Sequence, residues 1–132
     1  MTSRARAIAL VGVALIAGAA IGTRWRRGPK LEVGGVYTIQ DLANDFGSPR
    51  EFHVVKVIAL DNAVHVRSYG QTFRNRPATL EGVSLTLGTD HIPLSHAAFA
   101  AWQPVLISRS KVAPSELAGY QEWLRTYHGV WR

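Results

Sequence analysis

An uncharged run of sixteen residues near the N-terminus, residues 7–22, sets the strongest constraint on what this chain can fold into. Arginines precede and follow it, and the residues between them are apolar or small. As a helix the run would extend about 24 Å at ~1.5 Å per residue, slightly less than the ~30 Å hydrocarbon core of a bilayer. Flanking side chains that reach toward the headgroups make up the difference. We therefore predict a membrane anchor over residues 1–30 and one folded domain over residues 31–132.

Two other interpretations of this leader stay open. Ala17, Gly18 and Ala19 resemble the small-residue cleavage site of a secretory signal peptide. Four basic residues that follow the run within eight positions argue against cleavage, because they would have to cross the membrane just behind the signal. The third interpretation is a buried helix of a soluble protein. The pattern favours a retained single-pass anchor.

Small residues recur along one face of the predicted membrane helix. Ala14, Gly18 and Gly22 are spaced by four, which lets a second transmembrane helix approach closely. A run rich in alanine and glycine also produces such spacing by chance. On the hypothesis of a retained anchor, the partners are the lipid bilayer and one or more integral membrane proteins.

Basic residues around Trp25 predict the position of the membrane interface. Arginine and tryptophan are enriched where a helix leaves the bilayer, and more basic residues follow the apolar run than precede it. This asymmetry favours a cytoplasmic location for the folded domain. The predicted interface residues are Arg24, Trp25, Arg26 and Arg27.

The net charge of +6 arises from residues 1–30 and not from the predicted domain. Residues 1–30 hold six basic residues and no acidic ones, whereas residues 31–132 hold nine of each sign. A nucleic-acid-binding module usually carries a basic surface on its folded part, because contacts with phosphates supply most of its affinity. We therefore predict no nucleic-acid partner.

Two segments rich in β-branched residues, 52–60 and 64–69, flank Asp61, Asn62 and Ala63 and predict a hairpin. The length of its loop decides which residues face each other. A two-residue loop would place Lys56 opposite Arg67, and like charges directly opposite are destabilising. A three-residue loop pairs Leu60 with Val64 and Ile58 with Val66, and this is the register that we predict.

Further strands are expected at residues 31–39, 79–87 and 104–108. Ser95 is placed to cap a short helix that extends to Trp102. Pro114 fits the first turn of a C-terminal helix in which Leu117, Tyr120, Leu124 and Tyr127 share one face. The predicted fold class is mainly β (α+β), a small SH3-like half-barrel or bent antiparallel sheet with a C-terminal amphipathic helix.

Several short segments carry a resemblance to other proteins. They are residues 55–61, residues 64–69, Phe73 with Arg76 and Pro77, residues 91–95 and residues 117–120. Together these segments resemble a group of short bacterial proteins of no known activity. The resemblance implies a bacterial source and a recurring domain, and hence the inner (cytoplasmic) membrane as the location. It transfers no ligand, reaction or catalytic residue.

The residue types that carry chemistry do not form a recognisable motif. The chain has no cysteine, and its five histidines lack the spacing of metal ligands. Asp90, Ser95 and His96 are triad residue types, but no nucleophile elbow accompanies them. No phosphate-binding loop or dinucleotide fingerprint occurs. We therefore predict no catalytic residue, no metal and no cofactor.

One basic and aromatic cluster follows the hairpin and is the predicted partner contact. Its alternative is ordinary, namely arginines that are solvated or paired with carboxylates. The predicted function is a non-catalytic single-span accessory or scaffold subunit of a membrane assembly. The alternatives are a membrane-tethered module for a peptide or small anionic ligand and, third, an enzyme in which several of His65, His91, Asp90 and Arg67 converge in a pocket. The predicted contact residues are Arg67, Tyr69, Phe73, Arg74 and Arg76.

Overall fold

The computed structural model describes residues 30–40, 51–126 and 129–132. Apart from Lys30, the predicted anchor lies outside these ranges, and so do its packing residues Ala14, Gly18 and Gly22 and its interface residues 24–27. Within the described ranges no helix has the length and apolar character needed to cross a bilayer. The strands and helices of residues 31–132 form one compact unit.

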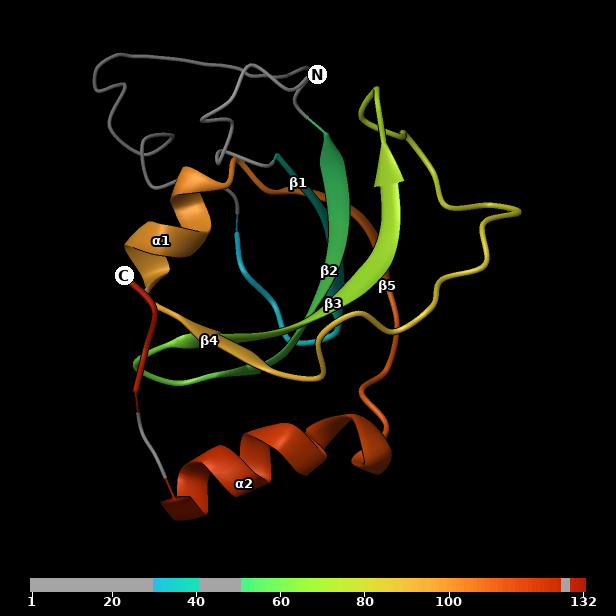
Figure 1. Ribbon diagram of the computed structural model, residues 1–132. Coiled ribbons are helices and arrows are strands. Elements are labelled where there is room, and N and C mark those ends of the chain that lie inside the picture. Colours follow the sequence, from blue (N-terminus) through green and yellow to red (C-terminus); the bar gives the residue numbers. More distant parts are fainter. Residues whose placement is uncertain (1–29, 41–50, 127–128) are drawn as a thin grey trace. The chain divides into compact units, whose positions relative to one another are not determined.

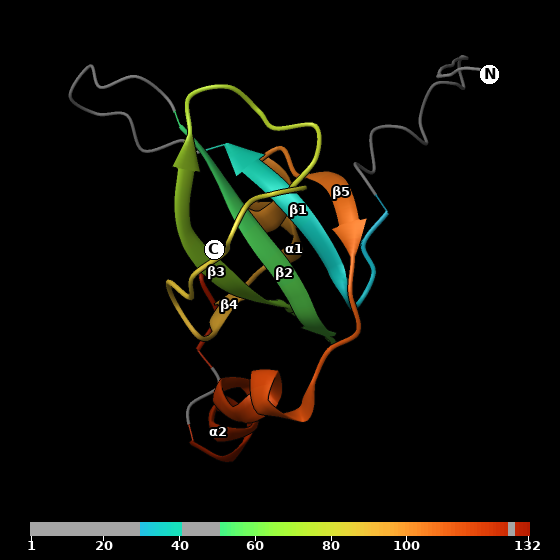
Figure 2. The ribbon, with the colours of Figure 1, turned by 90° about the vertical axis from the view of Figure 1, so that its right-hand side faces the viewer.

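Five antiparallel strands form a single sheet in the order β4-β3-β2-β1-β5 (Figure 1). The mainly β class with a C-terminal helix is thereby confirmed. Figure 2 shows β1, β2 and β3 side by side, with β5 next to β1. The strands are β1 (Gly35–Gln40), β2 (Phe52–Leu60), β3 (Val64–Phe73), β4 (Ile92–Leu94) and β5 (Val105–Arg109).

The predicted strand over residues 79–87 is wrong. This segment turns at Gly82, which has a φ of 76°, and a hydrogen bond from Val83 N–H to the Leu80 carbonyl closes the turn. Only Leu87 forms a bridge to β3, opposite Tyr69. The fifth strand is instead β4, which was not predicted from the sequence. It is short and contains Pro93, so its local strand signal is weak.

The hairpin has the predicted three-residue loop, and Leu60 pairs with Val64 as expected. The rest of the predicted register is wrong, because Val57 rather than Ile58 lies opposite Val66. A β-bulge at Ile58 adds one residue to β2 and shifts the pairing.

The bulge has two consequences for the sheet. Val55 and Val57 reach the same buried core as Val64 and Val66. The shift also places Lys56 opposite Arg67, although a register with these like charges opposite each other was not expected. The reason it is tolerated is a carboxylate from the C-terminal helical segment, described below.

The core lies between the sheet and α1 (His96–Ala101). Phe99 is buried and meets the Tyr37 ring edge-on, with 5.6 Å between the ring centroids. As predicted, Ser95 caps the helix, and its hydroxyl accepts a hydrogen bond from Ala98 N–H at 3.0 Å. In Figure 1, α1 and α2 lie on opposite sides of the end of the sheet that the β2–β3 hairpin and β4 form.

The C-terminal helical segment starts at Pro114, as predicted, with a 3-10 turn, η3 (Pro114–Leu117), that continues into α2 (Ala118–Thr126). After α2 the chain returns to the sheet, where Trp131 forms a parallel bridge with Leu94. Ser95 N–H donates to the Trp131 carbonyl at 2.7 Å, and Trp131 N–H donates to the Pro93 carbonyl at 2.9 Å. The expected apolar face of α2 is only partly buried, because Leu124 is 47% exposed.

Candidate functional site

The site begins with the hairpin turn, because Asp61 uses its side chain to close it. Asp61 N–H donates to the Ala63 carbonyl at 3.0 Å, and Ala63 N–H donates to Asp61 Oδ1 at 2.8 Å. Aspartate favours such turns because its short side chain can accept from the backbone two residues later. The turn therefore fixes the position of a carboxylate at the end of the sheet.

A chain of side-chain hydrogen bonds leads from this carboxylate into the protein. His65, which is fully buried, places Nε2 2.9 Å from Asp61 Oδ1 and Nδ1 2.9 Å from His91 Nε2. The Tyr120 hydroxyl donates to Asp61 Oδ2 at 3.1 Å. With Asp61 ionised and His65 in the tautomer that carries the proton on Nε2, Nε2–H donates to Asp61 and Nδ1 accepts a hydrogen bond from His91 Nε2–H. The two nitrogens of His65 face different partners, which suits a linear chain and not a chelate.

These donors control the ionisation of Asp61. Burial acts to raise the pKa of its carboxyl group, but the hydrogen bonds from Ala63, His65 and Tyr120 outweigh burial and hold the pKa below its usual value. Asp61 is therefore a carboxylate at neutral pH.

Aromatic rings from α2 enclose His65. The centroids of the Tyr120 and Trp123 rings lie 4.5 and 4.6 Å from that of the imidazole, and His91 stacks on it at 5.1 Å. Gly119 permits this approach, because a Cβ atom there would lie 2.6 Å from Asp90 Oδ2. Helix α2 is thus docked on the hairpin by a buried imidazole and a glycine.

A second polar cluster holds the start of the helical segment. Lys56, only 4% exposed, donates to Glu116 Oε1 and to the Lys111 carbonyl, both at 2.9 Å. Arg67 lies 3.9 Å from Glu116 Oε2 and 3.6 Å from Asp90. Glu116 therefore neutralises the two cations that the bulge brings opposite each other.

The pKa of Glu116 reflects this role. Burial acts to raise the pKa of the carboxyl group, but hydrogen bonds from Ala113 N–H and Lys56, with the charges of Lys56 and Arg67, hold the pKa below its usual value. Glu116 is ionised at neutral pH, as the buried Lys56 and the half-buried Arg67 require.

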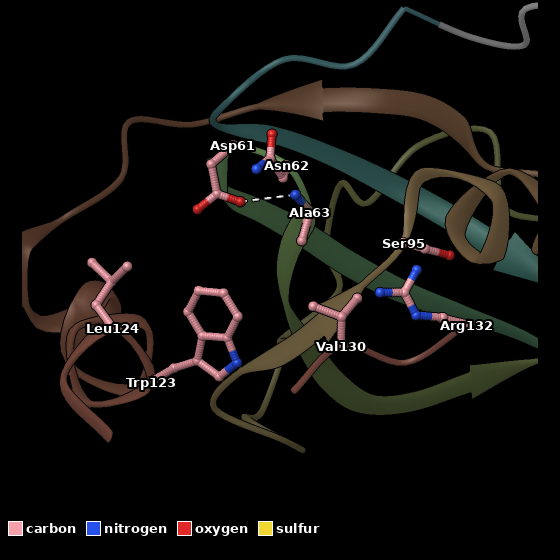
Figure 3. A pocket seen from close by; sticks show the side chains of 8 residues that line it. All are labelled: Asp61, Asn62, Ala63, Ser95, Trp123, Leu124, Val130 and Arg132. Atoms are coloured by element: carbon pink, nitrogen blue, oxygen red, sulfur yellow. Dashed lines mark hydrogen bonds between the residues drawn. The ribbon is translucent and has the colours of Figure 1, made fainter. Parts of the chain in front are cut away.

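A cavity of about 400 Å³ lies beside the hairpin turn, between α2 and the C-terminal segment. In Figure 3 the Asp61 carboxylate lies at the upper left and the Arg132 guanidinium at the right, with Trp123 below Asp61 and Val130 between Trp123 and Arg132. The volume falls within the range typical of ligand pockets, roughly 300–1,000 Å³. The cavity is lined by Asp61, Asn62, Ala63, Ser95, Trp123, Leu124, Val130 and Arg132.

The residues predicted as a partner contact do not form one free surface. Arg67 is held in the ionic cluster just described. Arg76 donates to the Thr38 hydroxyl at 2.7 Å and to the Gln103 carbonyl at 3.1 Å, and it stacks on the Phe52 ring at 4.7 Å. Arg74 is exposed, and Tyr69 and Phe73 are half-buried.

The residues named for a possible enzyme do converge, but away from the cavity. His65 contacts His91, and Arg67 contacts Asp90. None of these four residues lines the cavity. In the part of the chain that the structure describes, no three histidine, aspartate or glutamate side chains form a metal-binding group.

Comparison with protein-family models, with curated proteins and with solved structures finds no match. The resemblance to short bacterial proteins therefore stays a prediction, and any function must be argued from the geometry.

The His65–His91 pair makes the stability of the domain depend on pH. Burial, and next the neighbouring His65, lower the pKa of His91 below 6.5, although Asp90 and Asp61 oppose the shift. The folded state therefore binds fewer protons than the unfolded state just below pH 6.5, so stability is complete above this pH and falls as the pH drops through the lowered pKa.

His91→Gln should remove this part of the dependence, because its amide can still donate to His65 but cannot titrate. Thermal unfolding of both proteins from neutral to mildly acid pH measures it. The wild type should lose more stability than the variant before Asp61 and Glu116 begin to protonate. If the stability of the wild type and of His91→Gln falls equally with decreasing pH, His91 does not cause the pH dependence.

Proposed function

We propose that the chain is a non-catalytic, single-span accessory or scaffold subunit of a membrane protein assembly. Residues 7–22 anchor it and pack against partner helices through Ala14, Gly18 and Gly22, and the folded domain docks on a partner subunit. The proposed location is the bacterial inner membrane, with the domain on the cytoplasmic side. The proposed partners are integral membrane proteins and the lipid bilayer. As part of the same proposal, the sheet is of the SH3-like half-barrel type.

One observation carries the docking part of this proposal. Apolar side chains line the cavity, namely those of Trp123, Val130 and Leu124, and Leu124 is 47% exposed. Single exposed apolar residues are common on protein surfaces. Leu124 is not isolated in this way, because it lies next to Trp123 in the wall of the cavity, and tryptophan is enriched among the few residues that dominate the binding energy of protein interfaces.

The charge of the cavity indicates its occupant. Asp61 and Arg132 stand on opposite sides, and apolar side chains lie between them. A segment of a partner subunit with an apolar centre and one charge of each sign complements this arrangement. We propose such a segment as the docked element.

The polar clusters support a non-catalytic role. His65 is fully buried against the Tyr120 and Trp123 rings of α2, and Lys56, nearly as buried, joins η3 to the sheet through its hydrogen bond to Glu116. Their role in holding the C-terminal helical segment on the sheet explains why these two polar side chains are buried. A substrate cannot contact His65 without movement of α2, because the rings of Tyr120 and Trp123 cover it.

The alternative is a membrane-tethered module for a peptide or small anionic ligand. Its predicted surface, around Arg67, Arg74 and Arg76, is less favoured because Arg67 and Arg76 have internal partners. A peptide in the cavity would fit this alternative as well. Isolation of the protein distinguishes the two functions. An accessory subunit is isolated within a larger assembly, whereas a tethered binding module is isolated alone.

Substitution of Leu124 tests the docking surface. Full-length Leu124→Asp, expressed in its source membrane and extracted in mild detergent, should lose the co-isolated partner at least about tenfold, because a charge is placed in the apolar contact. Leu87→Asp is the matched control, since Leu87 is 51% exposed and does not line the cavity. Equal recovery of the partner with Leu124→Asp and Leu87→Asp would contradict docking at the cavity.

A further inference from the structure

We infer that the Asp61 side of the cavity is a subsite for a cationic group, and that the docked segment places a lysine or arginine side chain there. The statement that a docked partner segment supplies this cation rests on the proposed docking function. The subsite itself rests only on the geometry of Asp61, Trp123 and Leu124.

The hydrogen bonds of Asp61 leave room for one more donor. A carboxylate has about four acceptor positions. Ala63 N–H and His65 occupy two on Oδ1, and the Tyr120 hydroxyl occupies one on Oδ2. Oδ2 therefore keeps one acceptor position with respect to the described residues. The side chain is 37% exposed and lines the cavity, so a ligand can reach it.

Asp61 also differs in charge balance from the other carboxylates of the site. Glu116 is paired with Lys56, and Asp90 lies 3.6 Å from Arg67. Among the described residues the ion-pair partner of Asp61 is His65, which is charged only when it is protonated. A positive group in the cavity would give Asp61 a permanently charged counterion.

The walls next to Asp61 suit the stem of a basic side chain. Trp123 donates its indole N–H to the Gly129 carbonyl at 2.9 Å, so the ring contributes apolar surface and not a donor. An ammonium or guanidinium group within about 6 Å of an aromatic face is attracted to it. Leu124 adds a wall for methylene groups, which basic side chains bury readily. Arg132 on the far side repels a second cation and sets the orientation of the ligand.

The test uses small probes on the full-length protein in detergent. The probes are n-butylammonium, n-butyrate and n-butanol, which share an apolar chain and differ in charge. The readout is the NMR shift of the Trp123 indole N–H, assigned with Trp123→Phe. We expect n-butylammonium to shift this signal saturably, with a dissociation constant about tenfold lower than either other probe.

Two variants decide the result. Asp61→Asn keeps an acceptor for Ala63 N–H but removes the charge, and it should raise the dissociation constant of n-butylammonium about tenfold. Arg132→Glu, on the opposite side, should lower it several-fold. Glu122→Gln, on α2 but outside the cavity, is the control and should change nothing. If the three probes bind equally, or if both variants bind n-butylammonium like the wild type, the subsite is refuted.

The outcomes also separate this inference from the proposed function. Selective binding of n-butylammonium together with normal partner recovery by Leu124→Asp would keep the subsite and reject docking at the cavity. Equal binding of the three probes together with loss of the partner in Leu124→Asp would keep docking at the cavity and reject a cation subsite at Asp61.

Discussion

Glu116→Leu is expected to lower the free energy of unfolding by about 3 kcal/mol, within the range found when one partner of a buried ion pair is removed. The variant leaves the Lys56 ammonium, which is 4% exposed, without a carboxylate and leaves Arg67 beside it. It also removes the acceptor of Ala113 N–H at the start of η3. Denaturant unfolding of the full-length protein, followed by near-ultraviolet circular dichroism, measures the change.

Two further variants define the cause of that loss. Glu122→Gln breaks the exposed pair with Arg125 and should cost less than about 0.5 kcal/mol. Lys56→Met combined with Glu116→Leu should recover a large part of the stability, because no buried charge is then left unpaired. If Glu116→Leu costs no more than Glu122→Gln, Glu116 does not offset the charges of Lys56 and Arg67.

Phe99→Ala should destabilise the domain by about 3–5 kcal/mol, the usual cost of deleting a buried phenylalanine ring. Phe99 is the fully buried side chain of α1, and it packs edge-on against Tyr37 at the centre of the core. The cavity left behind cannot close easily, since Ser95 and Trp102 fix both ends of the helix by hydrogen bonds.

Thermal or denaturant unfolding measures the effect of Phe99→Ala. Val105→Ala is the comparison, because Val105 is 43% exposed on β5 and its truncation should cost about 0.5 kcal/mol or less. Similar losses for both variants would mean that α1 does not cover the core.

Features that depend on a few neighbouring residues were predictable from the sequence. The three-residue turn at Asp61, the Ser95 cap and the start of the helical segment at Pro114 all have local causes. The bulge at Ile58 has none, because Val55 and Val57 are as apolar as Ile58 and each could face the core. The predicted register, which kept Lys56 and Arg67 apart, is therefore not the one adopted. The bulge brings these two cations opposite each other, and Glu116, sixty residues beyond Lys56, neutralises them.

The candidate site was harder to predict because its residues come from the hairpin turn, from Ser95 and from the C-terminal part of the chain, which are far apart in the sequence. Asp61 belongs to a turn, Trp123 to α2 and Arg132 to the last residues. From the sequence, Asp61 was predicted only as a turn residue, and Leu124 only as part of the apolar face of a helix. Their common cavity follows from the return of the chain past β4, which the Trp131–Leu94 bridge fixes and no local pattern indicates.

The same contacts connect the site to the stability of the fold. Helix α2 is held by Glu116 near its start and by Tyr120 on Asp61 further along. Because Trp123 and Leu124 follow on the same helix, loss of these contacts should loosen the cavity wall. Variants that weaken docking should therefore be compared at equal folded fraction.

Extraction of the native, untagged protein tests the central proposal most directly. Membranes from the source are solubilised in mild detergent, separated on a native gel, and the bands analysed by mass spectrometry. The accessory-subunit proposal predicts that the chain stays with the membrane until detergent is added, keeps residues 1–30, and migrates with a larger integral membrane assembly. Recovery of the chain in the soluble fraction without residues 1–30, or as a monomer free of partners, would contradict it.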